Sequence, residues 1–163
     1  MHINIFHNLI LYLDCEPGYE DIKSNNFPLS NSGSKYCYKI VDDDDDEKTY
    51  ESARNVCKSD GGELACFEDV EMRNLLSDKC DDCWVGYKWK GDSIKGSWKS
   101  ESSDCPEKVV AGQDWGFDVI GSCARTTESK LSKNKLTRKP CKSKLGQLFK
   151  FGYICQTRKK GKH

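Results

Sequence analysis

The stretch "TYESARNVCKSDGGELA", Thr49 to Ala65, carries two structural patterns in succession. Thr49 is a residue type that caps helix N-termini. Tyr50, Ala53 and Cys57 follow at the spacing that places side chains on one face of a helix. A pair of glycines then interrupts the pattern, and "ELACF" after it is typical of a short strand. The stretch therefore predicts a helix whose buried face presents a cysteine, followed by a strand.

The rest of the chain adds a second helix and several short strands. "EDVEMRNLLSD", residues 68–78, predicts a helix in which Met72, Leu75 and Leu76 face inward. Strands are predicted for four runs rich in β-branched and aromatic residues: "YCYKIV" (36–41), "CWVGYKW" (83–89), "GSW" (96–98) and "GYICQ" (152–156). Residues 99–136 are irregular. We therefore expect an α+β fold with a long loop.

The chain contains ten cysteines in 163 residues, an even number that favours disulfides in an oxidising, extracellular environment. A zinc site is the competing interpretation, and "CDDC", Cys80 to Cys83, is the only C-x-x-C pair. No second pair follows at zinc-finger spacing, and the three histidines lie near the chain ends. We therefore expect disulfides and no metal site.

Charge is unevenly distributed along the chain. The whole sequence balances 26 basic against 26 acidic residues, but the segment from Arg125 to His163 contains 13 basic residues and one acidic residue, Glu128. A basic block favours polyanionic partners, although acidic and basic segments also cover one another in many folds. The acidic run "DDDDDEK", residues 42–48, is expected to be a solvated loop, and no ligand spacing supports a cation site there.

Both chain ends are predicted to lie outside the main domain. Residues 1–14 contain a short apolar run without a basic start, which we interpret as a weak or truncated export signal. Residues 157–163, "TRKKGKH", are expected to be a mobile basic tail. A single secreted domain is thus expected over residues 15–156. No segment is long and apolar enough to predict a membrane span.

Several short motifs occur together in a fixed order. They are "CYKI" (37–40), the stretch 49–65, "WVGY" (84–87), "GSW" (96–98), Cys123, Cys141 and "FGYICQ" (151–156). With these motifs the chain resembles the C-type lectin domain family from about Cys15 to Gln156. "WVGY" stands in place of the family's W-I-G-L, and "FGYICQ" in place of its final F-I-C-E. The resemblance implies two helices with small antiparallel sheets and a long loop pinned by a disulfide.

The resemblance also implies how six of the cysteines pair. The implied disulfides are Cys57–Cys155, Cys123–Cys141 and, as in the family's longer form, Cys15–Cys37. The cysteines that remain are Cys66, Cys80, Cys83 and Cys105, and four cysteines allow three pairings. We take Cys66–Cys83 and Cys80–Cys105 as the working pairing.

Calcium is the cofactor of the sugar-binding members of this family, and its ligands are replaced here. Those members use an E-P-N or Q-P-D triplet in the long loop and a W-N-D triplet before the third core cysteine. The second triplet corresponds to Leu136, Thr137 and Arg138, which puts a guanidinium where a divalent cation would sit. The nearest match to the first, residues 113–115, lacks the proline, and residues 121–122 replace the acidic residue before the loop cysteine. We therefore expect neither calcium nor another cofactor.

The sequence supports two hypotheses about the partner. The first is a lectin-like module that binds carbohydrate without calcium and favours sulfated or carboxylated glycans through the basic segment 125–144. The second is a protein-binding lectin-like module without sugar activity. The candidate ligand-binding residues are Gln113, Asp114, Trp115, Arg125, Lys135, Arg138 and Lys139. Trp115 has two interpretations, because it would either stack on a sugar or fill the core under the loop.

Other classes of function find no support in the motifs. The chain has no G-x-S-x-G, H-E-x-x-H or glycine-rich phosphate-loop signature, so we expect no enzymatic activity. Basic tails attract nucleic acid, but export and disulfides argue against nucleic acid as the natural partner.

Overall fold

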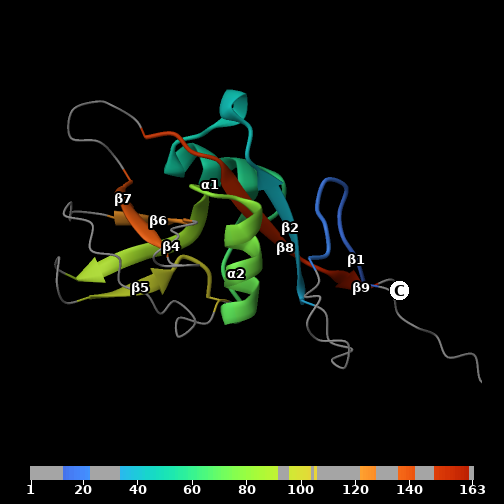
Figure 1. The fold of residues 1–163 in the computed structure, drawn as a ribbon. Helices are drawn as coiled ribbons and strands as arrows, with labels where there is room; N and C mark the ends of the chain where they lie inside the picture. Colours follow the sequence, from blue (N-terminus) through green and yellow to red (C-terminus); the bar gives the residue numbers. More distant parts are fainter. Residues whose placement is uncertain are drawn as a thin grey trace, which may run out of the picture.

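The computed structural model describes residues 13–22, 34–91, 96–103, 105, 122–127, 136–141 and 149–161. Two α-helices and a mixed sheet make up this part of the chain (Figure 1), so the expected α+β class is confirmed. None of its helices has both the length and the apolar character needed to cross a membrane. Most of the predicted export signal lies outside the described residues, as do residues 106–121 of the long loop.

Helix α1, Tyr50–Ser59, forms where the sequence predicts it. The Thr49 hydroxyl accepts a hydrogen bond from the backbone N–H of Ser52 at 3.2 Å, which satisfies one of the free donors at the helix start. The buried residues of the helix are the three expected on its inner face: Tyr50, Ala53 and Cys57.

Helix α2, Val70–Lys79, begins later than predicted because Asp69 is its cap. The Asp69 carboxylate accepts a hydrogen bond from the backbone N–H of Met72 at 2.7 Å, while the backbone of Asp69 itself is extended. Met72 and Leu76 are buried and Leu75 is partly buried, so the predicted inner face is confirmed.

Seven strands form one sheet, and two more form a small ribbon at its end. The strands of the sheet are β2 (Tyr36–Val41), β3 (Glu63–Leu64), β4 (Trp84–Gly91), β5 (Gly96–Ser100), β6 (Ser122–Arg125), β7 (Thr137–Pro140) and β8 (Tyr153–Arg158). Their order is β2-β8-β4-β6-β7, with β3 beside β8 and β5 beside β4. All pairs are antiparallel except β4 with β8, which makes the sheet mixed. The small antiparallel sheets that we expected form a single sheet here, because β8 pairs with β2 on one side and with β4 on the other.

The ribbon pairs the two ends of the described chain. β1 (Leu13–Asp14) runs antiparallel to β9 (Lys160–Gly161). Strand β8 continues to Arg158, which pairs with Tyr36 of β2, so the domain boundary predicted at Gln156 falls inside a strand. The part of the predicted basic tail up to Gly161 therefore belongs to folded structure.

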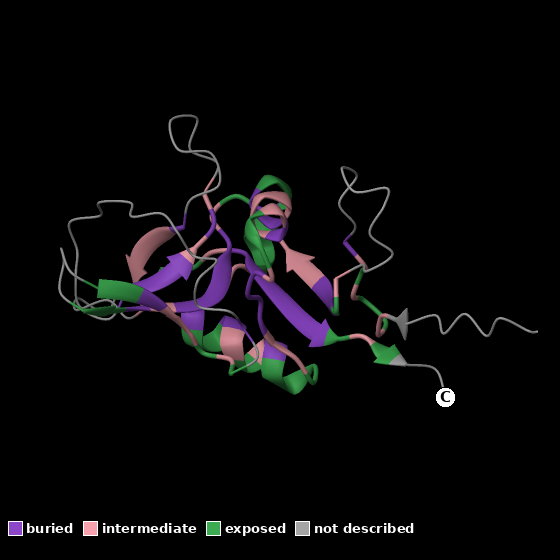
Figure 2. Cartoon of the chain, turned by 90° about the horizontal axis from the view of Figure 1, so that it is seen from below, coloured by how far each residue is buried: buried purple, intermediate pink, exposed green. Residues whose placement is uncertain are grey.

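Buried residues gather along the central strands, and exposed residues lie on the outer faces of the helices (Figure 2). Trp84 of β4 is fully buried and packs edge-on against Tyr50 of α1, with 5.5 Å between ring centroids, and against Phe151 at 5.0 Å. Its indole N–H donates to the backbone carbonyl of Lys48 at 2.9 Å, so its one polar group is satisfied. Trp84 therefore packs α1 and the segment before β8 against β4.

Five disulfides cross-link these elements. Three are the pairs that the resemblance implies: Cys15–Cys37, Cys57–Cys155 and Cys123–Cys141. The other two are Cys66–Cys105 and Cys80–Cys83, so the working pairing of Cys66 with Cys83 and of Cys80 with Cys105 is wrong. One of these two pairs is local, and the other joins segments that are distant in sequence.

Cys80 and Cys83 flank one tight turn between α2 and β4, with their Cα atoms 5.8 Å apart. Cys66 and Cys105 meet instead at the side chain of Gln156 in β8, whose amide nitrogen is 3.2 Å from the Cys66 sulfur and 3.6 Å from the Cys105 sulfur. A contact to a strand so distant in sequence is not visible in the spacing of the cysteines.

The five aspartates of the acidic run are exposed, as predicted for a solvated segment. The run is more ordered than the sequence predicts, because one turn of 3-10 helix, η1 (Asp44–Asp46), forms within it. The carboxylate of Asp43 caps this turn by accepting a hydrogen bond from the backbone N–H of Asp45 at 3.0 Å.

Candidate ligand-binding surface

Three of the seven candidate residues fall in the antiparallel pair formed by β6 and β7. Arg125 is the last residue of β6 and lies opposite Thr137, while Arg138 lies opposite Ala124, and Lys139 follows Arg138 in β7. The other candidates lie outside the described residues: Gln113, Asp114, Trp115 and Lys135. The β6–β7 pair, residues 122–125 and 137–140, is therefore the part of the predicted site that has a described geometry.

Arg125 is engaged within the protein. Its guanidinium forms an ion pair with Asp82 and lies over the ring of Phe151, 4.8 Å from the ring centroid. The side chain is only 14% exposed. Both its charge and its planar face therefore have partners within the protein, and its role in ligand binding stays a prediction.

Thr126, which follows Arg125, fastens the CDDC turn to the end of β6. Its hydroxyl donates to the carbonyl of Cys80 at 2.6 Å and accepts from the backbone N–H of Cys83 at 2.9 Å. Its own N–H donates to the carbonyl of Cys83 at 2.8 Å. These buried hydrogen bonds anchor Thr126, directly after β6, to the turn between α2 and β4.

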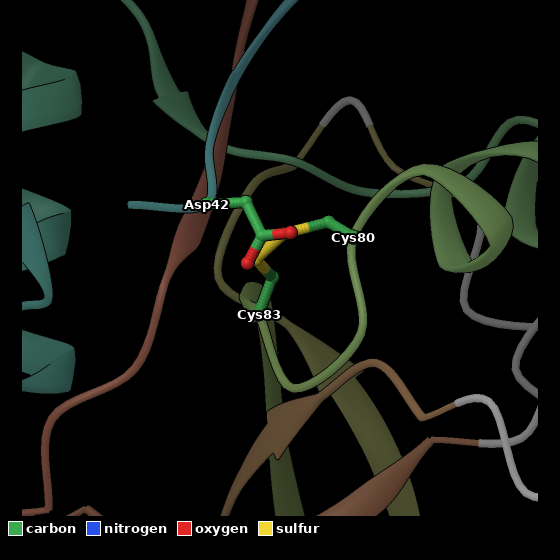
Figure 3. A group of neighbouring side chains, drawn as sticks. All are labelled: Asp42, Cys80 and Cys83. Carbon is green, nitrogen blue, oxygen red and sulfur yellow. A yellow bond between two sulfur atoms is a disulfide. The ribbon is translucent and has the colours of Figure 1, made fainter. Parts of the chain in front are cut away.

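The same turn brings a carboxylate next to a disulfide. Figure 3 shows Asp42, which directly follows β2, with its carboxylate beside the sulfurs of Cys80 and Cys83; the three possible ligand atoms lie within 4.8 Å of one another. Zinc requires deprotonated thiols, and these two sulfurs are bonded to each other. In the oxidised protein this cluster is a buried disulfide with an acidic neighbour, and the sulfurs offer no thiolate to a metal.

Arg138 stands at the position that the resemblance assigns to a calcium ligand, and it lies against a tryptophan. Its guanidinium carbon is 4.7 Å from the ring centroid of Trp89 in β4. Trp89 in turn packs edge-on against Trp98 of β5, with 5.5 Å between centroids, and both tryptophans are buried. A guanidinium held over an indole is worth about 1 kcal/mol or more. This stack fixes a permanent positive charge on β7, at the edge of the sheet.

Lys139 is the next cation along β7 and points to the other face of the strand. Its ammonium is 5.7 Å from the ring centroid of Phe149, which is 37% exposed. Phe149 precedes β8 in the chain and is one of two large apolar side chains exposed in the described residues, the other being Val70. Phe149 is therefore the exposed side chain next to β7, and the residues of β7 itself are partly buried.

The aromatic partners of these cations were missed in the sequence. Each of the three basic residues lies over a ring: Arg125 over Phe151, Arg138 over Trp89 and Lys139 over Phe149. The alternation in "WVGYKW" was the one available signal, since it places Trp89 on a defined face of β4. It does not indicate which basic residue lies on the same face, because that depends on the order of the strands in the sheet.

The described part of this surface does not fit a calcium ion. Calcium needs six to eight oxygen ligands, several of them carboxylates. Neither β6 nor β7 contains Asp or Glu, Leu136 before β7 is buried, and the only side-chain oxygen in β7 belongs to Thr137. Arg138 adds a positive charge where the ion would need a negative one.

No family model and no curated protein matches the chain. Solved structures do match it. A calcium-independent type II antifreeze protein has a TM-score of 0.57 and 17% identity, with 91% of this chain and 97% of that chain covered. The carbohydrate-recognition domain of the human scavenger receptor C-type lectin has a TM-score of 0.59 and 15% identity, with 90% and 100% covered.

The carbohydrate-recognition domain of cow CD23, crystallised in the presence of a GlcNAc2Man3 oligosaccharide, is also similar. Its TM-score is 0.56 and its identity 16%, with 91% of this chain and 99% of that chain covered. At such identities the similarity concerns the path of the backbone and leaves the ligand open.

Proposed function

We propose that this chain, which has the C-type lectin-like fold, is a secreted recognition module that binds anionic glycans without calcium. The ligand-binding surface in this proposal is the β7 edge of the sheet, with Arg138 and Lys139 as the described contacts. Two of the similar structures are carbohydrate-recognition domains, which makes a glycan a reasonable class of ligand for the same fold. The role is binding, without catalysis.

The observation that carries the proposal is the stack of Arg138 on Trp89. A guanidinium presents paired N–H donors whose geometry matches a carboxylate or a sulfate. The indole of Trp89 packs against one face of the guanidinium. The Arg138 side chain therefore loses less conformational freedom when an anion binds to the edge of the guanidinium. A preformed cation of this kind replaces the charge that calcium supplies to the sugar-binding members of the family.

Secretion is supported by the state of the cysteines. All ten are paired, including Cys57 with Cys155, which closes the chain over a separation of 98 residues. Disulfides of this number persist in oxidising compartments and are rare in a reducing cytosol.

A protein partner is the second candidate, and Phe149 is the observation that favours it. An exposed aromatic ring is typical of protein interfaces, because aromatic side chains are enriched there. The same part of the surface would then contact a protein rather than a sugar.

The test is retention of the oxidised protein on heparin, mannose and galactose resins, each with calcium and with chelator, over a salt gradient. The variants are R138M, K139M and R138K. K58M is the matched control, because Lys58 is an exposed cation at the end of α1. We expect R138M to weaken heparin binding by about tenfold, since one charge-assisted contact is lost, and R138K to restore part of it. K58M should elute close to the wild type.

Heparin retention that falls with salt and ignores chelator supports the proposal. Retention on a neutral sugar that chelator abolishes would overturn the calcium argument. If no resin retains the protein, the glycan proposal fails, and the F149A variant then tests the protein partner.

A further inference from the structure

The turn between α2 and β4 contains a disulfide that closes almost no loop. Cys80 and Cys83 are 3 residues apart, whereas the other disulfides join cysteines 18 to 98 residues apart. In the chain-entropy model, the stabilisation by a disulfide grows with the length of the loop that it closes. Opening this bond therefore costs the fold less than opening any of the others.

The backbone of this turn is held independently of the S–S bond. Thr126 forms hydrogen bonds, through its hydroxyl and its N–H, with the backbone of Cys80 and Cys83. The N–H of Trp84, the next residue, donates to the carbonyl of Gly152 at 2.9 Å. Since none of these hydrogen bonds involves a sulfur atom, we expect both cysteines to keep their places when the bond between them opens.

The end of β2 places a carboxylate against the same sulfurs. In Figure 3 the side chain of Asp42 lies beside those of Cys80 and Cys83, and one carboxylate oxygen and the two sulfurs are within 4.8 Å of one another. Residue 152 has to be a glycine for this approach, because a Cβ there would lie 2.6 Å from the Cys83 sulfur and 2.6 Å from the carbonyl oxygen of Val41. The backbone contact at Gly152 therefore brings Asp42 to the turn.

These three groups match ligands that zinc uses in proteins. Two cysteines separated by two residues have the C-x-x-C spacing of zinc sites, and aspartate is also a zinc ligand. The cysteines are buried but Asp42 is exposed, so an ion held between them would have one side open to water. The aspartates that follow Asp42 are exposed too, and their negative charge raises the local concentration of cations on that side.

The spacing of the turn suits a shared ion once the S–S bond is open. Two sulfurs at about 2.3 Å from a tetrahedral zinc ion lie about 3.8 Å from each other. The Cα atoms of Cys80 and Cys83 are 5.8 Å apart. Rotation of each side chain about its Cα–Cβ bond can therefore separate the sulfurs by the required distance while the backbone stays in place.

We propose that Asp42, Cys80 and Cys83 form a redox-controlled zinc site, which exists only when the disulfide is reduced. A dithiol reductant supplies two electrons and two protons by thiol–disulfide exchange and is oxidised to its own disulfide, while the two cysteines become thiols. Because both are buried, the exchange proceeds through local opening of the turn. Zn²⁺ then displaces the two thiol protons and binds both thiolates and the Asp42 carboxylate, and water takes the fourth position.

The first experiment asks which disulfide opens first. The folded protein is titrated with dithiothreitol, the thiols that appear are alkylated, and the labelled cysteines are identified by mass spectrometry. We expect Cys80 and Cys83 to be labelled before any other pair, with an unchanged far-ultraviolet circular dichroism spectrum. If another pair opens first, or if all the disulfides open together, the proposal is overturned.

The second experiment measures zinc binding by the selectively reduced protein. Dithiothreitol is first removed under anaerobic conditions, because dithiols bind zinc themselves, and the protein is titrated with Zn²⁺ in a calorimeter. A parallel titration with Co²⁺ reports thiolate ligands through its absorption spectrum. We expect one ion per chain, and binding weaker by about 100-fold or more in the oxidised protein and in the C80S/C83S variant, because neither offers a thiolate.

Two aspartate variants distinguish a ligand from a general effect of charge. D42N removes the proposed third ligand, whereas D44N removes the same charge from the same exposed run but outside the cluster. We expect D42N to weaken zinc binding by about tenfold or more, and D44N to change it by less than about twofold.

Three results would contradict the zinc site: no zinc binding by the reduced protein, equally tight binding by the oxidised protein, or equal losses in D42N and D44N. Heparin retention is measured on the oxidised protein and concerns the β7 surface. The failure of either proposal is therefore distinguishable from the failure of the other.

Discussion

Individual charged side chains in this domain have internal partners before any ligand is considered. The ammonium of Lys88 in β4 is 2.6 Å from the Glu101 carboxylate and 5.2 Å from the ring centroid of Tyr50. Glu101 also accepts a hydrogen bond from the Tyr50 hydroxyl at 2.7 Å and lies 3.6 Å from Arg54. Four side chains thus link α1 to β4 and to the end of β5.

The pH dependence of stability should report on this cluster. Burial would raise the pKa of Glu101, but the hydrogen bonds from Lys88 and Tyr50 outweigh it and hold that pKa below its ordinary value. A carboxyl with a lowered folded-state pKa stabilises the fold above its unfolded pKa, about 4.3, and loses this contribution as the pH falls through the folded pKa. We expect E101Q to reduce the free energy of unfolding by about 1 kcal/mol near neutral pH, with the difference shrinking below about pH 4.

Urea unfolding of E101Q and wild type across that range measures the effect. E51Q is the matched control, because Glu51 is half exposed and its ion pair with Arg54 should contribute little. A loss in E101Q that is the same at every pH would contradict the argument.

At this scale the sequence predicted which residues are charged but not which partners they have. Arg125 and Arg138 look alike in the basic segment. The fold places Arg125 against Asp82 and Phe151 and leaves Arg138 on a tryptophan at the edge of the sheet. Partners from distant strands decided the difference.

At the scale of elements, local signals fixed the two helices well. α1 starts directly after its predicted cap, Thr49, whereas α2 starts at Val70, two residues later than predicted, because Asp69 caps it. The strands were harder, since "ELACF" gives only the two-residue β3. A strand exists only where a neighbour pairs with it, and β3 pairs with β8 over two residues.

Removal of the α1 cap should destabilise the domain. We expect T49A to lower the free energy of unfolding by about 1 kcal/mol, because the N–H of Ser52 loses its acceptor, whereas T49S should lose little. Urea denaturation of the two variants and wild type distinguishes the cap from a mere change of side-chain volume. Equal losses in both variants would mean that the Thr49 methyl group, rather than the hydroxyl, carries the effect.

At the scale of the whole molecule, one disulfide and one strand hold the domain together. β8 lies between β2 and β4, and Cys155 within it bonds to Cys57 of α1 over a separation of 98 residues. Cys80–Cys83 closes a separation of only 3 residues. In the chain-entropy model, closing the longer loop removes far more freedom from the unfolded chain.

The two disulfides should therefore differ in their contribution to stability. We expect the double variant C57A/C155A to lose about 4 to 5 kcal/mol and C80A/C83A roughly 2 kcal/mol. Thermal and urea unfolding under non-reducing conditions gives both values. If the shorter bridge proves as costly to remove as the longer one, local packing rather than loop closure sets the contribution.

The sequence by itself determined the fold class, both helices, the inner face of α1 and three of the five disulfides, because these rest on local periodicity and on an order of motifs that survives at low identity. It also predicted that residues 136–138 do not match a calcium site, since that follows from the chemistry of the side chains alone. Only the tertiary structure decided the pair Cys66–Cys105 and the partners of Arg125 and Arg138. Each of these depends on which distant segments the sheet brings side by side, and no local pattern encodes that order.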